Sequence, residues 1–193
     1  MGRYKYFIAL VLSLIAVIGG VFYITNLPKA SKEGNTTTAS QSDRSAAAYG
    51  LLGSELPIFT ITDAEGKQIS SSDFKGKPTV IMEWASWCPH CQKTIPVMDK
   101  LYRKYKDEVE FVFINATGSA DGKETKEAAS SYIKKNNFEI SYYYDEGLKA
   151  ATVLQVESVP TFFFVDRSGI IREVANSDLN EEEAENMIKN IVV

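Results

Sequence analysis

Both cysteines of the chain lie in one pentapeptide, Trp87-Cys88-Pro89-His90-Cys91, between an apolar run and a segment with helical periodicity. Two thiols at this spacing can close a small disulfide ring and open it again. Closing so short a loop removes little entropy from the unfolded chain, so the pair is poorly suited to be a structural staple. The pattern therefore predicts a redox centre at the start of a helix.

The two residues between the cysteines affect the first thiol. Pro89 suits the first turn of a helix, because its missing N–H group costs nothing there. His90 can place a positive charge beside Cys88, and the free N–H groups of the helix start point the same way. Both effects favour the thiolate of Cys88, so we expect Cys88, and not Cys91, to attack substrates.

A metal site is the first alternative for this motif. Structural zinc takes four ligands, whereas the pentapeptide supplies two cysteines and the one histidine of the chain. Carboxylates could complete such a site, and two thiolates could also capture Cu(I), which would make the protein a binding module. We expect redox chemistry at Cys88 and Cys91 with no metal and no cofactor.

The N-terminal segment has the pattern of a membrane anchor. Arg3 and Lys5 precede an apolar run over residues 7–24, which as a helix would be about 27 Å long, enough to cross a bilayer core. The basic residues predict a cytoplasmic N-terminus at 1–6 and an extracytoplasmic domain on a single-pass protein of the bacterial cell membrane. A cleaved signal peptide is the alternative. Residues 25–48 are mostly small or polar and predict a flexible linker, so the folded domain should span 49–193.

The charge of the chain is uneven. The net charge is −4, but the first 48 residues carry five basic and two acidic side chains, which leaves 16 basic and 23 acidic ones in the remainder. An acidic domain without a basic stripe argues against nucleic acid as a partner.

Strand and helix patterns alternate along the domain. Strands are predicted at 79–84, 109–115, 140–144, 159–166 and 170–175, and helices at 92–106, 124–136, 148–154 and 180–192. A turn at 63–66 lies between two shorter segments, and Asn180 with Glu183 forms a capping box for the last helix. This order predicts an α/β fold with a mixed central sheet flanked by helices.

Four motifs, in this order and spacing, resemble membrane-tethered extracytoplasmic thioredoxin-fold proteins of the TlpA/ResA kind: F-x-I-x-D-x-x-G-K (59–67), D-F-K-G-K-P (73–78), W-A-S-W-C (84–88) and V-P-T (159–161). The resemblance implies a thioredoxin fold with a short N-terminal β-hairpin. It further implies that Cys88 attacks, that Cys91 resolves the mixed disulfide, and that Pro160 follows Val159 through a cis bond beside the disulfide.

Two departures from this family bear on the direction of electron flow. The Pro-His dipeptide and Val159 resemble the oxidising DsbA enzymes, and Thr94 stands where some haem-pathway reductases carry a glutamate. Stabilising the thiolate stabilises the reduced form and makes the disulfide more oxidising. We therefore expect a thiol oxidase that introduces disulfides into exported proteins and exchanges electrons with a membrane or extracytoplasmic redox partner.

Two alternatives to the oxidase stay open. The first is a reductase of exported proteins or apocytochromes, as in the TlpA/ResA group. The second is the Cu(I)-binding module, although copper assembly proteins on this fold use a histidine far along the chain and none follows His90.

Glu83 is the least expected residue near the motif. In related enzymes a buried acid six residues before the first cysteine relays the proton of the second, but here that position is Met82. Neighbours on a strand point to opposite faces, and an unpaired carboxylate on a buried strand would cost several kcal/mol or take up a proton. Three interpretations compete: a proton relay through a bulge or water, a salt bridge to a lysine, and a partly exposed side chain.

Overall fold

The computed structural model describes residues 47–119 and 122–192. The strands are β1 (Thr60–Thr62), β2 (Gln68–Ser70), β3 (Thr79–Trp84), β4 (Glu110–Asn115), β5 (Tyr142–Tyr144), β6 (Thr161–Val165) and β7 (Ile171–Ala175). The helices are η1 (Ala48–Leu51), η2 (Ser71–Phe74), α3 (Pro89–Tyr105), α4 (Lys126–Lys135), α5 (Lys149–Val153) and α6 (Glu181–Val192). In these described ranges no helix is both long and apolar enough to span a membrane. The predicted anchor, 7–24, lies outside the described residues. So does the predicted linker, except for its last two residues.

The strands form one mixed sheet in the order β2-β1-β5-β4-β3-β6-β7. β3 pairs parallel to β4 and antiparallel to β6, while β1 and β2 form an antiparallel pair where a short hairpin was expected. All six residues of β3 are buried, because strands cover both of its edges and helices cover both of its faces. The chain leaves the middle of the sheet at the end of β3 and enters the cysteine motif directly.

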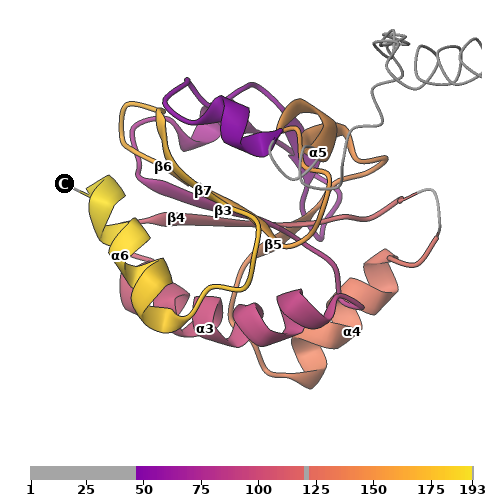
Figure 1. The fold of residues 1–193 in the computed structure, drawn as a ribbon. Helices are drawn as coiled ribbons and strands as arrows, with labels where there is room; N and C mark the ends of the chain where they lie inside the picture. The colour runs from indigo at the N-terminus through magenta and orange to yellow at the C-terminus, as the bar shows by residue number, and fades with distance from the viewer. Residues whose placement is uncertain (1–46, 120–121, 193) are drawn as a thin grey trace, which may run out of the picture. The chain divides into compact units, whose positions relative to one another are not determined.

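Helices cover the two faces of the sheet unequally. α3, α4 and α6 lie on one face, and η1 and α5 lie on the other (Figure 1). Along β3, Met82 and Trp84 pack into the core on the α3 side, whereas Ile81 packs into the core on the α5 side. Because side chains alternate along a strand, Glu83 belongs to the α5 side.

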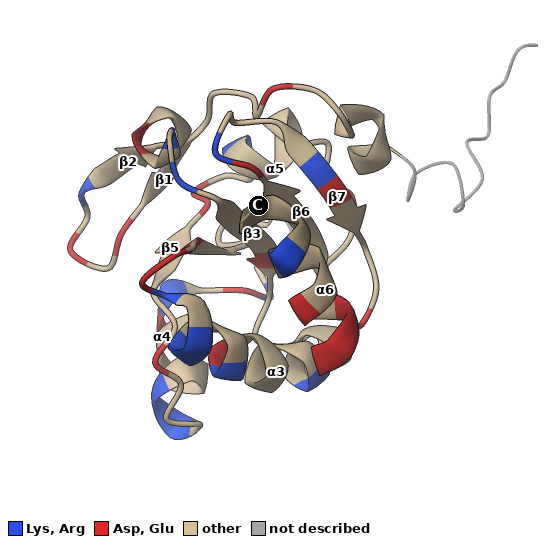
Figure 2. Ribbon diagram, turned by 90° about the vertical axis from the view of Figure 1, so that its left-hand side faces the viewer, with Lys and Arg blue, Asp and Glu red and all other residues tan. Residues whose placement is uncertain are grey.

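α6 packs beside α3 and holds the loop that precedes it. Its acidic residues lie next to basic residues of α3 (Figure 2), with Lys100–Glu181 and Lys104–Glu185 separated by 2.7 Å each. The predicted capping box is confirmed, since the Asn180 N–H donates to Glu183 Oε2 at 3.1 Å and the Glu183 N–H to Asn180 Oδ1 at 3.0 Å. These contacts fix the segment between β7 and α6, which reaches the start of α3.

Most element boundaries differ from those predicted by one or two residues, and three differences have a clear physical reason. Ala48, placed in the linker, is buried at the start of η1. α3 begins at Pro89, three residues earlier than predicted, because Cys88 provides its N-cap. β5 begins later than predicted, because the N–H groups of Glu139 and Ile140 donate to Asp99 Oδ1 on α3 and not to a neighbouring strand.

Candidate redox site

The two cysteines meet at the N-terminus of α3. Cys88 is the N-cap residue, and its Sγ accepts a hydrogen bond from the Cys91 N–H at 3.4 Å. The same sulfur donates to the carbonyl oxygen of Val159 at 3.3 Å, and the Val159–Pro160 bond is cis, as expected. Both cysteines are free and buried. The pairing of β3 with β6 thus brings the cysteine motif and the Val159–Pro160 loop together.

Cys91 lies in the core beneath Cys88. Burial raises the pKa of the Cys91 thiol far above its usual range; the backbone hydrogen bond to Ala85 opposes this, and Cys88 and the Glu124 charge add to the rise. Because the thiolate is the nucleophile, Cys91 at neutral pH is poorly prepared for a first attack. This arrangement agrees with the predicted order, in which Cys88 attacks and Cys91 resolves.

His90 has a partner that the sequence did not reveal. Its Nδ1 lies 2.6 Å from Asp178 Oδ1, and Lys93 Nζ lies 3.5 Å from Asp178 Oδ2. Burial works to raise the pKa of Asp178, but His90 and Lys93 outweigh it and lower the pKa. The prediction that His90 favours the Cys88 thiolate stays a prediction, but the structure shows the His90 imidazole in contact with a carboxylate.

Glu83 is fully buried, and neither of its carboxyl oxygens has a hydrogen-bond partner within residues 47–119 and 122–192. Burial raises its pKa well above the usual value, and the nearby Asp145 raises it further. The interpretations as a salt bridge to a lysine and as a partly exposed side chain are therefore wrong. The relay to Cys91 stays a prediction, although the two residues belong to opposite faces of the sheet.

Glu124 is a buried acid that the sequence analysis missed. Its Oε2 accepts hydrogen bonds from the Ser86 N–H at 3.0 Å and the Ser86 hydroxyl at 2.9 Å, and its Oε1 accepts one from Asn115 Nδ2 at 2.7 Å. These bonds hold the loop that leads into Cys88. The sequence predicted a helix that begins at Glu124, but the helix begins after it, with Thr125 as the N-cap. No local sequence pattern marks Glu124 as a buried acid.

The Val159–Pro160 loop separates two hollows. One lies on the α5 side, with Glu83 and Trp87 among its lining residues, and the other contains the His90–Asp178 pair. Trp87 is 46% exposed at the rim, while Trp84 is fully buried in the core. Cys88 therefore contacts a loop with an apolar hollow on one side and a polar one on the other.

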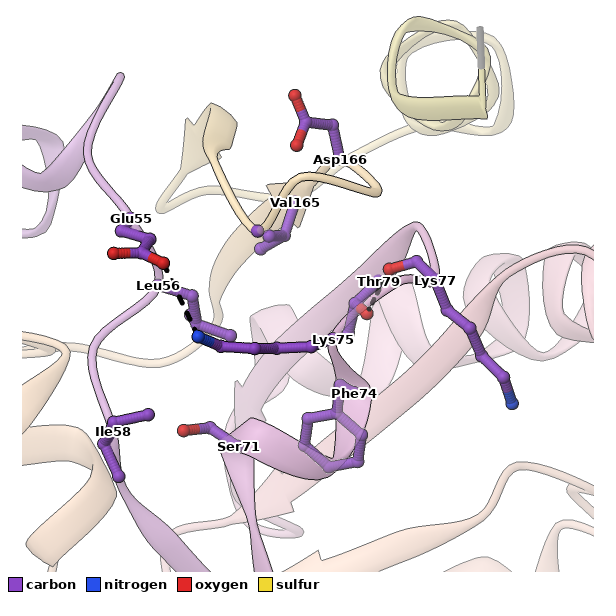
Figure 3. Close-up of a pocket in the computed structure, with 11 residues that line it drawn as sticks. Glu55, Leu56, Ile58, Ser71, Phe74, Lys75, Lys77, Thr79, Val165 and Asp166 are labelled. Atoms are coloured by element: carbon purple, nitrogen blue, oxygen red, sulfur yellow. Dashed lines mark hydrogen bonds and ion pairs between the residues drawn. The ribbon is translucent and has the colours of Figure 1, made fainter.

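A third hollow lies at the opposite end of β3, beside Thr79. Figure 3 shows Lys75 reaching Glu55, with 3.5 Å between Nζ and Oε1, and the Thr79 hydroxyl donating to the Lys77 carbonyl at 3.1 Å. The Ser71 hydroxyl also lies there and donates to the Pro57 carbonyl. These polar groups are paired within the fold, and the hollow is remote from the cysteines.

Comparisons with known proteins agree with this geometry. The AhpC/TSA family model matches residues 52–174. A thiol-disulfide oxidoreductase ResA from Bacillus cereus (strain ZK / E33L) is 33% identical over 141 residues, which are 72% of this chain and 78% of that protein.

Two solved structures are similar in fold. A thiol:disulfide interchange protein DsbE from Chlorobium tepidum has a TM-score of 0.63 at 22% identity, covering 74% of this chain and 98% of that one. The exposed lipoprotein thioredoxin Etrx1 from Streptococcus pneumoniae strain TIGR4 has a TM-score of 0.61 at 22% identity, covering 69% and 99%. Together with the mixed sheet and its flanking helices, these similarities identify a thioredoxin-like fold.

Proposed function

Because the chain belongs to the AhpC/TSA family and is a thiol-disulfide oxidoreductase, we propose that it reduces disulfides of exported proteins through Cys88 and Cys91. This direction is opposite to the one expected from the Pro-His dipeptide. The observation that carries it is the contact of 2.6 Å between His90 and Asp178.

The contact changes the electrostatics on which the oxidase prediction depended. A free imidazolium beside Cys88 would stabilise the thiolate, hence the reduced pair, and would make the disulfide strongly oxidising. An imidazolium bound to a carboxylate presents a smaller net positive charge to the same sulfur. The reduced form gains less stability, so the pair gives up its electrons more readily.

The proposed reaction has two steps. The Cys88 thiolate attacks one sulfur of a substrate disulfide, forming a mixed disulfide and releasing the other substrate sulfur as a thiolate. Cys91 then loses its proton and attacks the Cys88 sulfur, which releases the second substrate thiolate and leaves a Cys88–Cys91 disulfide. Two electrons pass to the substrate. A dithiol on a membrane or extracytoplasmic partner must then reduce the pair again.

The second step needs a base for the Cys91 proton. Glu124 suits this role better than Glu83, because it accepts two hydrogen bonds from Ser86, the residue after Ala85, whose backbone bonds to the Cys91 thiol. Glu83 belongs to the α5 side of the sheet, where the acid that acts on it is Asp145. We assign the proton of Cys91 to Glu124.

We place this reaction outside the cytoplasm, with the apolar segment 7–24 as a membrane anchor. The basic residues before that segment support this orientation, and so does the similarity to an exposed lipoprotein thioredoxin.

The equilibrium of the Cys88–Cys91 disulfide with glutathione tests the direction. We expect a potential nearer to that of thioredoxin, about −270 mV, than to that of DsbA, about −120 mV. A value within about 30 mV of DsbA would support the oxidase instead. If the reduced protein forms no mixed disulfide with substrate disulfides at either cysteine, thiol-disulfide exchange itself is the wrong function.

A further inference from the structure

The hollow on the α5 side of the Val159–Pro160 loop has a fully buried acid in a mostly apolar lining. The apolar residues are Trp87, Ala116, Leu148, Ala151, Val156 and Val159. Glu83 reaches the hollow from β3, Glu157 contributes a second carboxyl group and Ser158 completes the lining. Because the Val159 carbonyl also contacts Cys88 Sγ at 3.3 Å, the hollow lies beside the reacting sulfur.

The fold gives no reason for an acid at position 83. Ile81, two residues earlier on the same face of β3, packs into the apolar core, whereas Glu83 is equally buried and its oxygens have no partner. A buried carboxyl group without hydrogen bonds is costly. Such a group in a hollow beside a reactive centre is a candidate for ligand recognition.

The charges of the lining residues favour a positive guest, and the nearby Lys123 lies over the Trp87 ring at 5.6 Å. Asp145 stands behind Glu83, and its two oxygens are engaged by the N–H groups of Ala150 and Ala151 at 2.9 and 2.8 Å, so it is not free to bind a guest. Glu157 adds a further negative charge, and none of the nine described lining residues is basic. A cationic head would therefore meet Glu83 with two more carboxylates nearby.

We propose that this hollow binds a lysine or arginine side chain of the substrate, located within two residues of the cysteine that Cys88 attacks. The methylene groups of the guest pack on Leu148, Ala151 and Val156, and its cationic head pairs with Glu83. Long basic side chains suit such a site, since they bury an apolar stem and carry the charge at its end. The inference rests on the proposed function, because disulfide exchange brings the guest to the hollow.

The same geometry explains why an uncharged guest binds less well. Without a guest, burial and Asp145 raise the pKa of Glu83, so the carboxyl group keeps its proton. A cation at hydrogen-bond distance favours the ionised form and gives both oxygens a partner. A methionine side chain of similar length fills the apolar part but leaves Glu83 unpaired.

The test uses the reduced full-length protein and peptides that each hold one cysteine as a mixed disulfide with thionitrobenzoate. Attack by Cys88 on the peptide sulfur releases this chromophore, whose absorbance gives the second-order rate constant. A single lysine is moved through the four positions within two residues of the cysteine, with methionine in its place as the reference. We expect the lysine peptide to react about tenfold faster at one of these positions, an effect of the size of one charge-assisted contact.

Variants locate the effect. Glu83→Gln should bring the lysine-to-methionine ratio to about one, and Ala151→Leu, which fills the hollow, should do the same. Glu108→Gln, an exposed acid before β4 at the other end of the sheet, should keep the ratio. Equal rates at all four positions, or a preference that survives both hollow variants, overturn the inference and leave the proposed function standing. If no peptide reacts, the proposed function fails, and this inference fails with it.

Discussion

The two sides of the Val159–Pro160 loop hold acids in opposite states. On the α5 side, Glu83 is fully buried and unpaired, and its pKa is raised by burial and by Asp145. On the α6 side, Asp178 is partly exposed and binds His90 and Lys93, which lower its pKa against the effect of burial. The pKa of the same functional group is thus raised on one side of the cysteines and lowered on the other.

This difference separates two tasks. The Asp178 carboxylate is paired within the fold, with His90 and Lys93. The Glu83 carboxyl group has no hydrogen-bond partner among the described residues, so it can pair with a guest. We therefore propose that the His90–Asp178 side of the loop tunes the redox potential and that the Glu83 side selects the substrate.

The largest expected effect comes from the cysteine pair that lies between the two sides of the loop. Cys91→Ala removes the resolving thiol, so mixed disulfides should accumulate on Cys88 and turnover should stop. Non-reducing electrophoresis with mass spectrometry of the adducts measures this outcome. Cys88→Ala is the matched control and should form no adducts. Adducts that appear with Cys88→Ala, but not with Cys91→Ala, would reverse the roles of the two cysteines.

Glu124→Gln tests whether Glu124, and not Glu83, takes the proton of Cys91. We expect it to slow resolution by Cys91 about 100-fold near pH 7, the effect of losing a general base, while the first attack by Cys88 changes little. Rapid quenching of a preformed mixed disulfide gives the rate, and Glu127→Gln, in the first turn of α4, is the control. The relay hypothesis for Glu83 instead predicts that Glu83→Gln slows resolution near neutral pH and leaves the first attack by Cys88 intact.

Glu83→Met tests the cost of the unpaired acid. The apolar side chain has a similar length, so we expect the free energy of unfolding to rise by about 1–3 kcal/mol. Because the pKa of Glu83 is raised in the folded state, the folded protein holds a proton that the unfolded chain releases above about pH 4.3. The stability of the wild type then falls as pH rises from that value through the folded pKa, and the advantage of the variant grows over the same range.

Urea unfolding at several pH values between about 4.5 and 8 measures this trend. Glu108→Met, at an exposed position, is the control and should show no such dependence. An advantage that does not change with pH would mean that Glu83 is paired or hydrated, and the contrast between the two sides of the loop would be lost.

Local patterns predicted the framework of this fold. The strand at 79–84 and the Asn180–Glu183 capping box match the structure, because alternation and capping are set by residues close in sequence. The position of the cysteine motif beside a helix start was predictable for the same reason, but the helix begins at Pro89 and not at residue 92. β5 was predicted too long, because its first N–H groups bond to Asp99, about 40 residues earlier.

The sequence did not predict the contacts of the site that join residues far apart in the chain. His90 and Asp178 are 88 positions apart, and Ser86 and Glu124 are 38 apart. No periodicity connects such pairs, because the sheet order and the path of the loops bring them together. Glu83 could be singled out from the strand pattern, but its unpaired state depends on what α5 places around it.

Asp178→Asn has the smallest expected effect and bears directly on the polar side of the loop. The amide cannot carry the negative charge that His90 and Lys93 now meet, so the imidazolium would act on Cys88 with its full charge. We expect the Cys88–Cys91 potential to become more oxidising by about 30 mV, a tenfold change in the equilibrium with glutathione. The shift should shrink as salt is added, because the pair is exposed to solvent.

In a His90→Gln background the same substitution should change the potential little, since its effect passes through the histidine. Glu181→Gln, which removes an acid paired with Lys100, should leave the potential unchanged. A potential that does not move in Asp178→Asn would show that the pair does not tune Cys88, and the reducing direction would lose the observation that supports it.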